Sequence, residues 1–94
     1  MSTTLSNRRF SLGKVVITCG AIKAVSPEDS WEAIHRHASG DWGDLCDDDR
    51  QQNDEALECQ ARLLSRYFTR SGVCFWIITE WDRSVTTILL PEEF

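Results

Sequence analysis

The sequence lacks the motifs by which several protein classes are recognised. Its cysteines form no C-x-x-C pair, which excludes zinc-ribbon and thioredoxin-type sites, and no run of apolar residues approaches the ~18–20 that cross a bilayer. No apolar segment follows the basic pair Arg8-Arg9, so we expect no signal peptide, no membrane partner and a cytoplasmic location with reduced thiols. We expect no cofactor and no metal, and the roles of the Cys46 and Cys59 thiols stay open.

Basic residues are scarce relative to acidic ones. The 94 residues include 10 Lys and Arg against 15 Asp and Glu, which gives a net charge of −5. A protein that binds duplex DNA needs Lys and Arg to displace counterions, so this balance argues against duplex DNA as a partner. An acidic surface instead attracts a basic patch on another protein. The length indicates one domain, which we place at residues 10–94 after a disordered lead-in at residues 1–9.

The pattern of apolar residues predicts an α+β fold. Ser26-Pro27-Glu28-Asp29 is a strong helix start, with a Ser cap, Pro in the first turn and two acids near the positive end of the helix dipole. We expect two helices packed on one face of a three- to four-stranded antiparallel sheet. The expected helices span residues 27–38 and 47–60, after a single helical turn at 21–25, and the expected strands span residues 10–18, 62–70, 73–81 and 85–90.

Loop lengths predict the register of the sheet. A two-residue turn at 71–72 pairs Tyr67 with Trp76, and a three-residue turn at 82–84 pairs Glu80 with Thr86 and Thr79 with Thr87. Both faces of the sheet are then half apolar. The face that the helices leave open is a candidate binding surface or homodimer face, and the sequence does not say which face that is.

Polar residues at the end of the last hairpin are the first candidate site. Glu80, Arg83, Thr86 and Thr87 could hold an oxyanion or a phosphate, or they could form a hydrogen-bonded hairpin end. His37, one helical turn before a glycine-rich turn, is a candidate general acid or base, or a histidine at the core boundary that bonds to a carbonyl.

The segment between the two expected helices gives further candidates. Asp41 and Asp44 begin an acidic run that continues through residues 47–49 and that could cap a helix, bind a metal or dock a basic partner. The run lacks the spacing of a calcium loop. Trp42, between two glycines, is expected to be a plug on the core or, alternatively, a residue that stacks on a ligand.

Basic and aromatic residues alternate along the strand at 62–70. Arg62, Arg66 and Arg70 recur every four residues, beside Phe68 and Phe75. Such interleaving resembles a platform for single-stranded nucleic acid, so RNA is a candidate partner. The alternative is that these arginines only keep a half-exposed sheet soluble.

Three strings resemble a small bacterial family that is met on plasmids and other mobile elements and has no known function. The strings are Arg36-His37-x-x-Gly40-Asp41-Trp42-Gly43, Leu64-Ser65-x-Tyr67 and Ile77-Ile78-Thr79-Glu80-x-Asp82-Arg83-Ser84-x-Thr86-Thr87-Ile88-Leu89-Leu90-Pro91-x-Glu93-Phe94. The chain departs from the family pattern at Thr18-Cys19, where Thr-Pro is expected, and at Phe94, where Tyr is usual. The resemblance implies a setting on mobile elements rather than an activity.

A weaker resemblance is architectural. A helix that carries a His, followed by an antiparallel sheet with Arg, Ser, Tyr and Thr, is similar to the small metal-independent RNases of the barnase, colicin and RelE-type toxin group. That resemblance implies His37 as acid or base, Arg66 or Arg83 as phosphate clamp, and Ser65, Tyr67 and Thr86 as orienting hydroxyls.

Two functions are therefore expected from the sequence. The first is a protein-binding module that modulates or inhibits a host or defence protein. The second is an RNase or toxin-like phosphoryl-transfer enzyme that uses His37, Glu80, Arg83 and Thr86.

Overall fold

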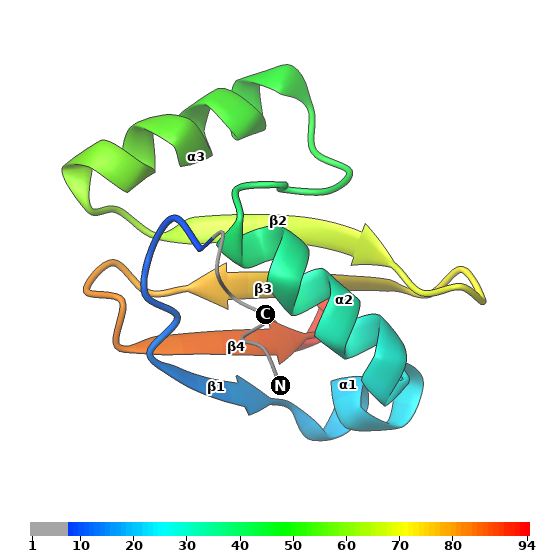
Figure 1. Ribbon diagram of the computed structural model, residues 1–94. Coiled ribbons are helices and arrows are strands. Elements are labelled where there is room, and N and C mark those ends of the chain that lie inside the picture. The colour runs from blue at the N-terminus through cyan, green and yellow to red at the C-terminus, as the bar shows by residue number, and fades with distance from the viewer. Residues whose placement is uncertain (1–7) are drawn as a thin grey trace.

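The computed structural model describes residues 8–94 and confirms the α+β class. A four-stranded sheet has the strand order β1-β4-β3-β2, and its helices lie mainly on one side (Figure 1). The elements are β1 (Lys14–Ile17), α1 (Cys19–Ala24), α2 (Pro27–Ala38), α3 (Asp47–Cys59), β2 (Leu63–Phe68), β3 (Cys74–Thr79), β4 (Val85–Leu89) and the 3-10 turn η1 (Pro91–Glu93).

The sheet is mixed, and the expectation of a purely antiparallel sheet was wrong. β1 runs parallel to β4, whereas β2, β3 and β4 form an antiparallel meander. Three helices and two strands separate β1 from β4 in the chain, so no hairpin fixes their relative direction. Of the predicted lead-in, residues 1–7 lie outside the described residues, and the Arg9 backbone N–H donates to the Ala38 carbonyl oxygen at 2.7 Å.

The start of α2 follows from its local sequence. The Ser26 hydroxyl accepts a hydrogen bond from the Asp29 backbone N–H at 3.1 Å, and Pro27 occupies the first turn, where no backbone donor is needed. The helix then spans the predicted residues. α3 also begins where its acidic first turn predicts, and it ends at Gln60, whose φ of 56° is left-handed.

Both hairpin registers differ from the predicted ones by one residue. Tyr67 pairs with Phe75 rather than with Trp76, and Thr79 pairs with Thr86 rather than with Thr87. Each loop is one residue longer than expected. Thr69 bonds to Val73 across a three-residue loop that ends at Gly72, whose φ is positive. Glu80 bonds to Val85 across a four-residue loop in which Arg83 has a φ of 60°.

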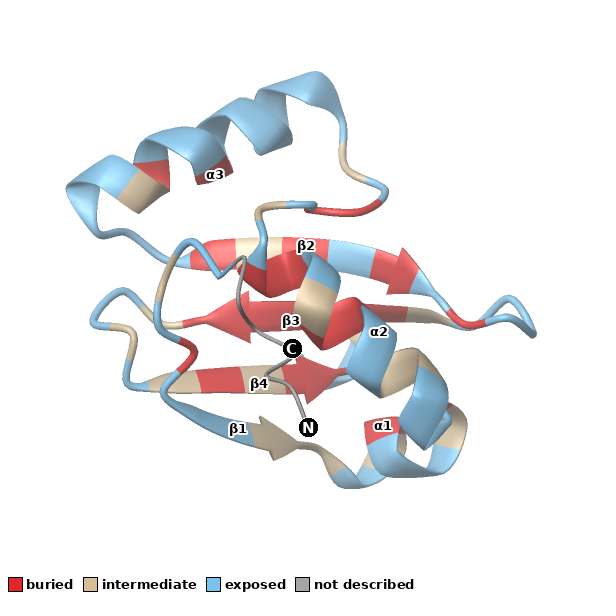
Figure 2. Cartoon of the chain, viewed as in Figure 1, coloured by how far each residue is buried: buried red, intermediate tan, exposed pale blue. Residues whose placement is uncertain are grey.

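The observed register makes the two faces of the sheet unequal. The face under α2 is almost wholly buried, as the red segments of β2, β3 and β4 show in Figure 2. Its side chains are those of Leu63, Ser65, Tyr67, Phe75, Ile77, Thr79, Thr86 and Ile88. The opposite face has no α-helix among the described residues, and it carries Leu64, Arg66, Phe68, Trp76, Ile78, Glu80, Thr87 and Leu89.

The two edges of the sheet differ as well. The Asn53 side chain of α3 donates to the Leu64 carbonyl at 2.6 Å and accepts from the Leu64 N–H at 3.2 Å. The turn before α3 bonds both backbone groups of Arg66, through the Trp42 carbonyl and the Asp44 N–H. The β2 edge is thereby covered by the chain itself, whereas no residue from 8 to 94 pairs with the outer edge of β1.

Candidate functional site

The predicted polar residues that meet in space form a buried network beneath α2. His37 Nδ1 lies 2.5 Å from Ser65 Oγ, and His37 Nε2 lies 2.9 Å from Thr79 Oγ1. Thr79 Oγ1 lies 2.7 Å from Thr86 Oγ1, which in turn donates to the Leu12 carbonyl oxygen at 2.7 Å. None of the four side chains is exposed to solvent, so the network is part of the core.

The end of this network fixes the direction of every bond in it. Because Thr86 gives its proton to a carbonyl, it must accept from Thr79, and Thr79 must accept from His37. The neutral ring therefore carries its proton on Nε2, and Ser65 donates to Nδ1. Every polar atom of the ring is satisfied within the protein, which leaves no nitrogen to take a proton from a substrate.

The electrostatics of His37 favour the same neutral form. Burial lowers the pKa of the imidazole from 6.5 to about 3, with a further contribution from the positive charge of Arg83. A general base works best with a pKa near the operating pH and with access to its substrate. His37 has neither property and instead joins the end of α2 to two sheet residues, Ser65 and Thr79.

The other two predicted catalytic residues are engaged elsewhere. Glu80 is on the opposite face of the sheet, where its carboxylate lies 3.4 Å from the Arg62 guanidinium. Arg83 donates to the Ala61 carbonyl at 2.6 Å and to the Ala56 carbonyl at 3.0 Å, and burial lowers its pKa. Arg83 thus ties the β3–β4 loop to the C-terminal end of α3 and to the residue pair that follows it.

The turn between α2 and α3 has a structural role. Trp42 is buried, as the plug interpretation predicts, and its indole N–H donates to Asp54 at 3.1 Å. Asp41 pairs with Arg36 at 2.8 Å, a contact that lowers the pKa of its carboxyl group, and its carbonyl accepts from the Tyr67 hydroxyl at 2.6 Å. Burial in turn raises the pKa of Tyr67. Asp44 is exposed and contributes its backbone N–H to the β2 edge.

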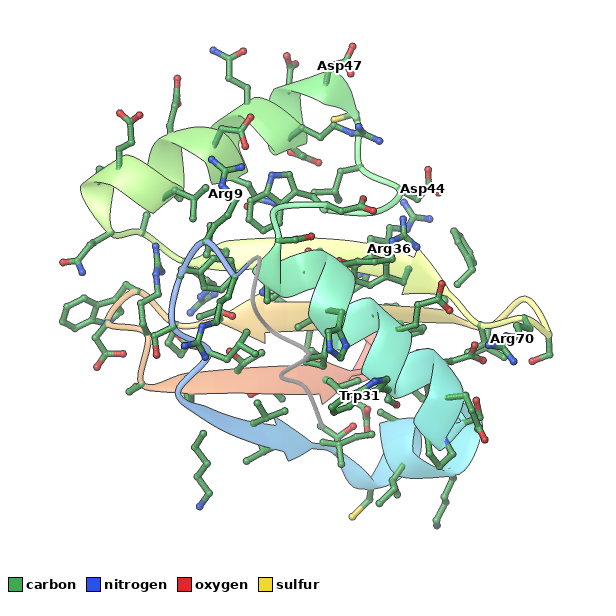
Figure 3. The ribbon with its side chains drawn as sticks, in the orientation of Figure 1. Arg9, Trp31, Arg36, Asp44, Asp47 and Arg70 are labelled. Atoms are coloured by element: carbon green, nitrogen blue, oxygen red, sulfur yellow. The ribbon has the colours of Figure 1, made fainter. Side chains whose placement is uncertain are left out.

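The basic and aromatic residues of β2 do not form the expected platform. Arg66 lies over the Phe68 ring on the face without helices, with its guanidinium carbon 5.5 Å from the ring centroid. Phe75, however, is buried on the other face, and Arg70 bends toward α2, where it lies 3.3 Å from Asp29 (Figure 3). Thr87 is half-buried on the face without helices. The platform therefore reduces to a single arginine and phenylalanine pair beside Trp76 and Phe94, whose ring centroids are 5.6 Å apart.

An apolar groove that the sequence did not indicate lies beside the free edge of β1. It has a volume of about 480 Å³ and runs between β1, α1 and α2. Val15, Ile22 and Trp31 line it and remain 46%, 62% and 58% exposed. The groove depends on the position of β1 beside β4, which places Val15 and Ile17 next to α1 and α2.

The negative charge is concentrated on a single helix. α3 carries six carboxylates against one arginine, a net charge of −5 that equals the charge of the whole chain. Only Asn53, Ala56 and, in part, Leu57 turn toward the protein, so the helix is almost wholly exposed in Figure 2. All six carboxylates are exposed: Asp47, Asp48, Asp49, Asp54, Glu55 and Glu58.

An exposed aromatic residue lies near the C-terminal end of that helix. Trp81 is 62% exposed in the loop between β3 and β4. Arg83, in the same loop, donates to the Ala56 carbonyl of α3 and to the Ala61 carbonyl just after it, and so holds the loop against the end of the helix. Acidic side chains and a large apolar side chain thus occur together on this side of the molecule.

Neither a metal centre nor a membrane-spanning element emerges from the part of the chain that the structure describes. Within residues 8–94, His, Cys, Asp and Glu side chains nowhere gather in the group of three that a metal ion would need. No helix in the same range has both the length and the apolar character to cross a bilayer.

Comparisons with known proteins give no family. The chain matches no protein-family model, no curated protein and no solved structure. The resemblance to plasmid and mobile-element proteins therefore stays a prediction, and the arguments about function depend on the geometry above.

Proposed function

We propose that this protein is a cytoplasmic protein-binding module whose partner presents a basic surface to α3. The observation that carries the proposal is the concentration of the whole net charge on one exposed helix. Such a field speeds the approach of a positively charged surface and repels nucleic acid phosphates. RNA and duplex DNA are accordingly disfavoured as partners.

The exposed Trp81 supports the proposal independently of charge. Binding energy at interfaces is concentrated in a few aromatic and arginine side chains, and exposed charges mainly set the rate of association and its salt dependence. Trp81 would be the apolar anchor beside the acidic helix. Following the resemblance to mobile-element proteins, the partner class we propose is a host or defence protein that this chain modulates or inhibits.

The RNase alternative has less support from the geometry. Acid-base catalysis on RNA needs a titrating group within hydrogen-bond reach of the substrate. His37 is fully buried and neutral, Arg83 is bound to carbonyl oxygens, and Glu80 lies across the sheet from His37. Within residues 8–94, the side chains of His37, Arg83 and Glu80 therefore share no common surface on which a substrate could bind.

The test uses two variants that have the same net charge. One replaces Asp47, Asp48 and Asp49 by Ser, and its control replaces Glu28, Glu32 and Glu92 by Gln, so each loses three negative charges. We expect a partner captured from bacterial lysate by the wild type to bind the control equally, and to bind the α3 variant at least about tenfold more weakly, a loss of about 1.4 kcal/mol.

Two further measurements make the test specific. The affinity of the wild-type complex should fall as salt is raised, and a Trp81→Ser variant should dissociate faster at the same net charge. Equal binding by the α3 variant and its control, or no captured partner for any of the proteins, would contradict the proposal. Circular dichroism at neutral pH checks that each variant is folded.

A further inference from the structure

The outer edge of β1 presents unpaired backbone groups. In the parallel pair with β4, the N–H groups of Lys14 and Thr18 bond to carbonyls of that strand at 3.0 Å. Because neighbouring residues of a strand point their backbone groups to opposite sides, the N–H and C=O of Val15 and Ile17 point away from β4. No residue from 8 to 94 bonds to them.

The same two residues form one wall of the apolar groove. Val15 pairs with Thr86 and Ile17 with Ile88, which places both side chains on the face covered by helices. Ile22 of α1 and Trp31 of α2 form the facing walls. The edge therefore offers hydrogen-bonding groups and apolar side chains together, as strand-addition sites do.

We propose that a second copy of this chain occupies the edge, with β1 paired antiparallel to β1 of its partner about a two-fold axis at Val16. This axis sets Val15 opposite Ile17 of the other copy, and in an antiparallel ladder such a pair exchanges both N–H···O=C bonds. The residues with outward backbone groups thus pair with each other, and the two grooves meet side by side. The result is one continuous sheet of eight strands, with the helices of both copies on the same face.

The charge distribution favours a second copy as the occupant. The charge of α3 equals the net charge of the chain, and α3 packs against β2 at the other edge of the sheet, so two copies that meet at β1 keep their acidic helices away from the contact. In Figure 3, Asp47 is at the top of the view, at the start of α3, and Trp31 lies well below it, beside α2. An interface at β1 thus keeps the two acidic helices apart and leaves both free for the proposed basic partner.

The covered β2 edge limits the assembly to two copies. Asn53 and the backbone of the Trp42–Asp44 turn already bond the outward groups of Leu64 and Arg66, so only Phe68 at the end of β2 is left for a third copy, which is too short an edge for strand addition. An isologous contact through β1 is closed, as in most soluble dimers. This differs from the homodimer expected from the sequence, which used the open face of the sheet.

The test is the mass of the protein in solution, measured by sedimentation equilibrium from micromolar to millimolar concentration. We expect wild type to move from monomer to twice the monomer mass. We expect Val15→Pro, which removes an outward N–H, and Trp31→Ser, which removes a groove wall, to stay monomeric over the same range. A Phe68→Ser variant, altered on the open face of the sheet, should dimerise as wild type does.

The outcomes separate the alternatives. A wild type that is monomeric at every concentration overturns the proposal, and so does a dimer that only Phe68→Ser disrupts. If Val15→Pro unfolds, Trp31→Ser leaves the strand backbone intact and decides the matter alone. In a chain whose four native cysteines are replaced by serine, crosslinking of a Val16→Cys variant, altered at the proposed two-fold axis, should join two copies, with or without Phe68→Ser, and should not do so in combination with Val15→Pro or Trp31→Ser.

Discussion

The buried neutral state of His37 should make the protein lose stability as the pH falls through the weakly acidic range. Folding depresses the pKa of the ring from 6.5 to about 3. Below pH 6.5 the unfolded chain therefore binds a proton that the folded chain refuses, so the free energy of unfolding falls with decreasing pH. Above pH 6.5 both states are neutral, and the full stability is present.

The size of the effect follows from the width of that window. Each pH unit between the two pKa values costs about 1.4 kcal/mol, so the change from pH 7 to pH 5 removes about 2 kcal/mol. That is a large part of the ~5–15 kcal/mol by which a small domain is stable. Arg36 lowers the pKa of Asp41 below its ordinary value of 3.8, so the protonation of Asp41 reduces the free energy of unfolding only at more acidic pH.

Urea unfolding at pH 7 and pH 5, followed by tryptophan fluorescence, measures this loss. A His37→Gln variant has no titrating ring at this position and should lose little stability between the two pH values, whatever its absolute stability. His35→Gln is the matched control and should keep the wild-type fall. An equal fall in wild type and His37→Gln would refute the reasoning, as would an NMR titration in which the His37 ring of the folded protein protonates above pH 5.

Three substitutions test the supports of α3 and of the turn before it. Arg83→Ala removes the guanidinium donors from the Ala61 and Ala56 carbonyls and releases the β3–β4 loop from the end of α3, so we expect about 1–3 kcal/mol of lost stability and faster amide exchange in the last turn of that helix. Asn53→Ala orphans both backbone groups of Leu64, and we expect a similar loss in urea unfolding together with a greater tendency to aggregate through the uncovered edge. Gly43→Ala should fail to fold or lose far more stability than Gly72→Ala, because a Cβ at position 43 meets a backbone oxygen, whereas one at position 72 meets nothing within 4 Å. Both glycines have positive φ, so Gly72→Ala measures the ~1–2 kcal/mol conformational cost alone.

The local sequence predicts the helices and strands well because each has its own start or period. The cap at Ser26-Pro27 predicts where α2 begins, and the runs of β-branched and aromatic residues predict where the strands lie. The direction of β1 could not be predicted, since it depends on contacts between residues more than 60 positions apart, such as Val15 and Thr86. The register of the β3–β4 hairpin was mispredicted because Arg83 adopts a left-handed conformation that its residue type does not indicate, and the β2–β3 loop includes Arg70 in addition to the expected two-residue turn.

The sequence predicted several residues of the candidate site correctly but not their structural role. His37, Ser65 and Thr86 were predicted as acid-base or orienting groups and Thr79 was expected to pair with Thr87, whereas the structure brings all four together. Their burial depends on which face of the sheet α2 covers, and a one-residue register error reverses that choice. The groove at β1 and the isolation of charge on α3 are properties of the assembled fold.

The four-residue network under α2 also distinguishes this fold from its nearest competitor. Both faces of the sheet carry many apolar side chains, so a strand displaced by one residue would still pack apolar side chains against the helices. If β2 and β3 were each displaced by one residue, so that Leu64 and Ile78 took the places of Ser65 and Thr79 beneath α2, the nitrogens of the His37 ring would be buried without partners. The hydrogen bonds of His37 therefore favour one alignment of the strands over the others. A neutral, inaccessible imidazole has no catalytic use here, but it makes the folded state unique.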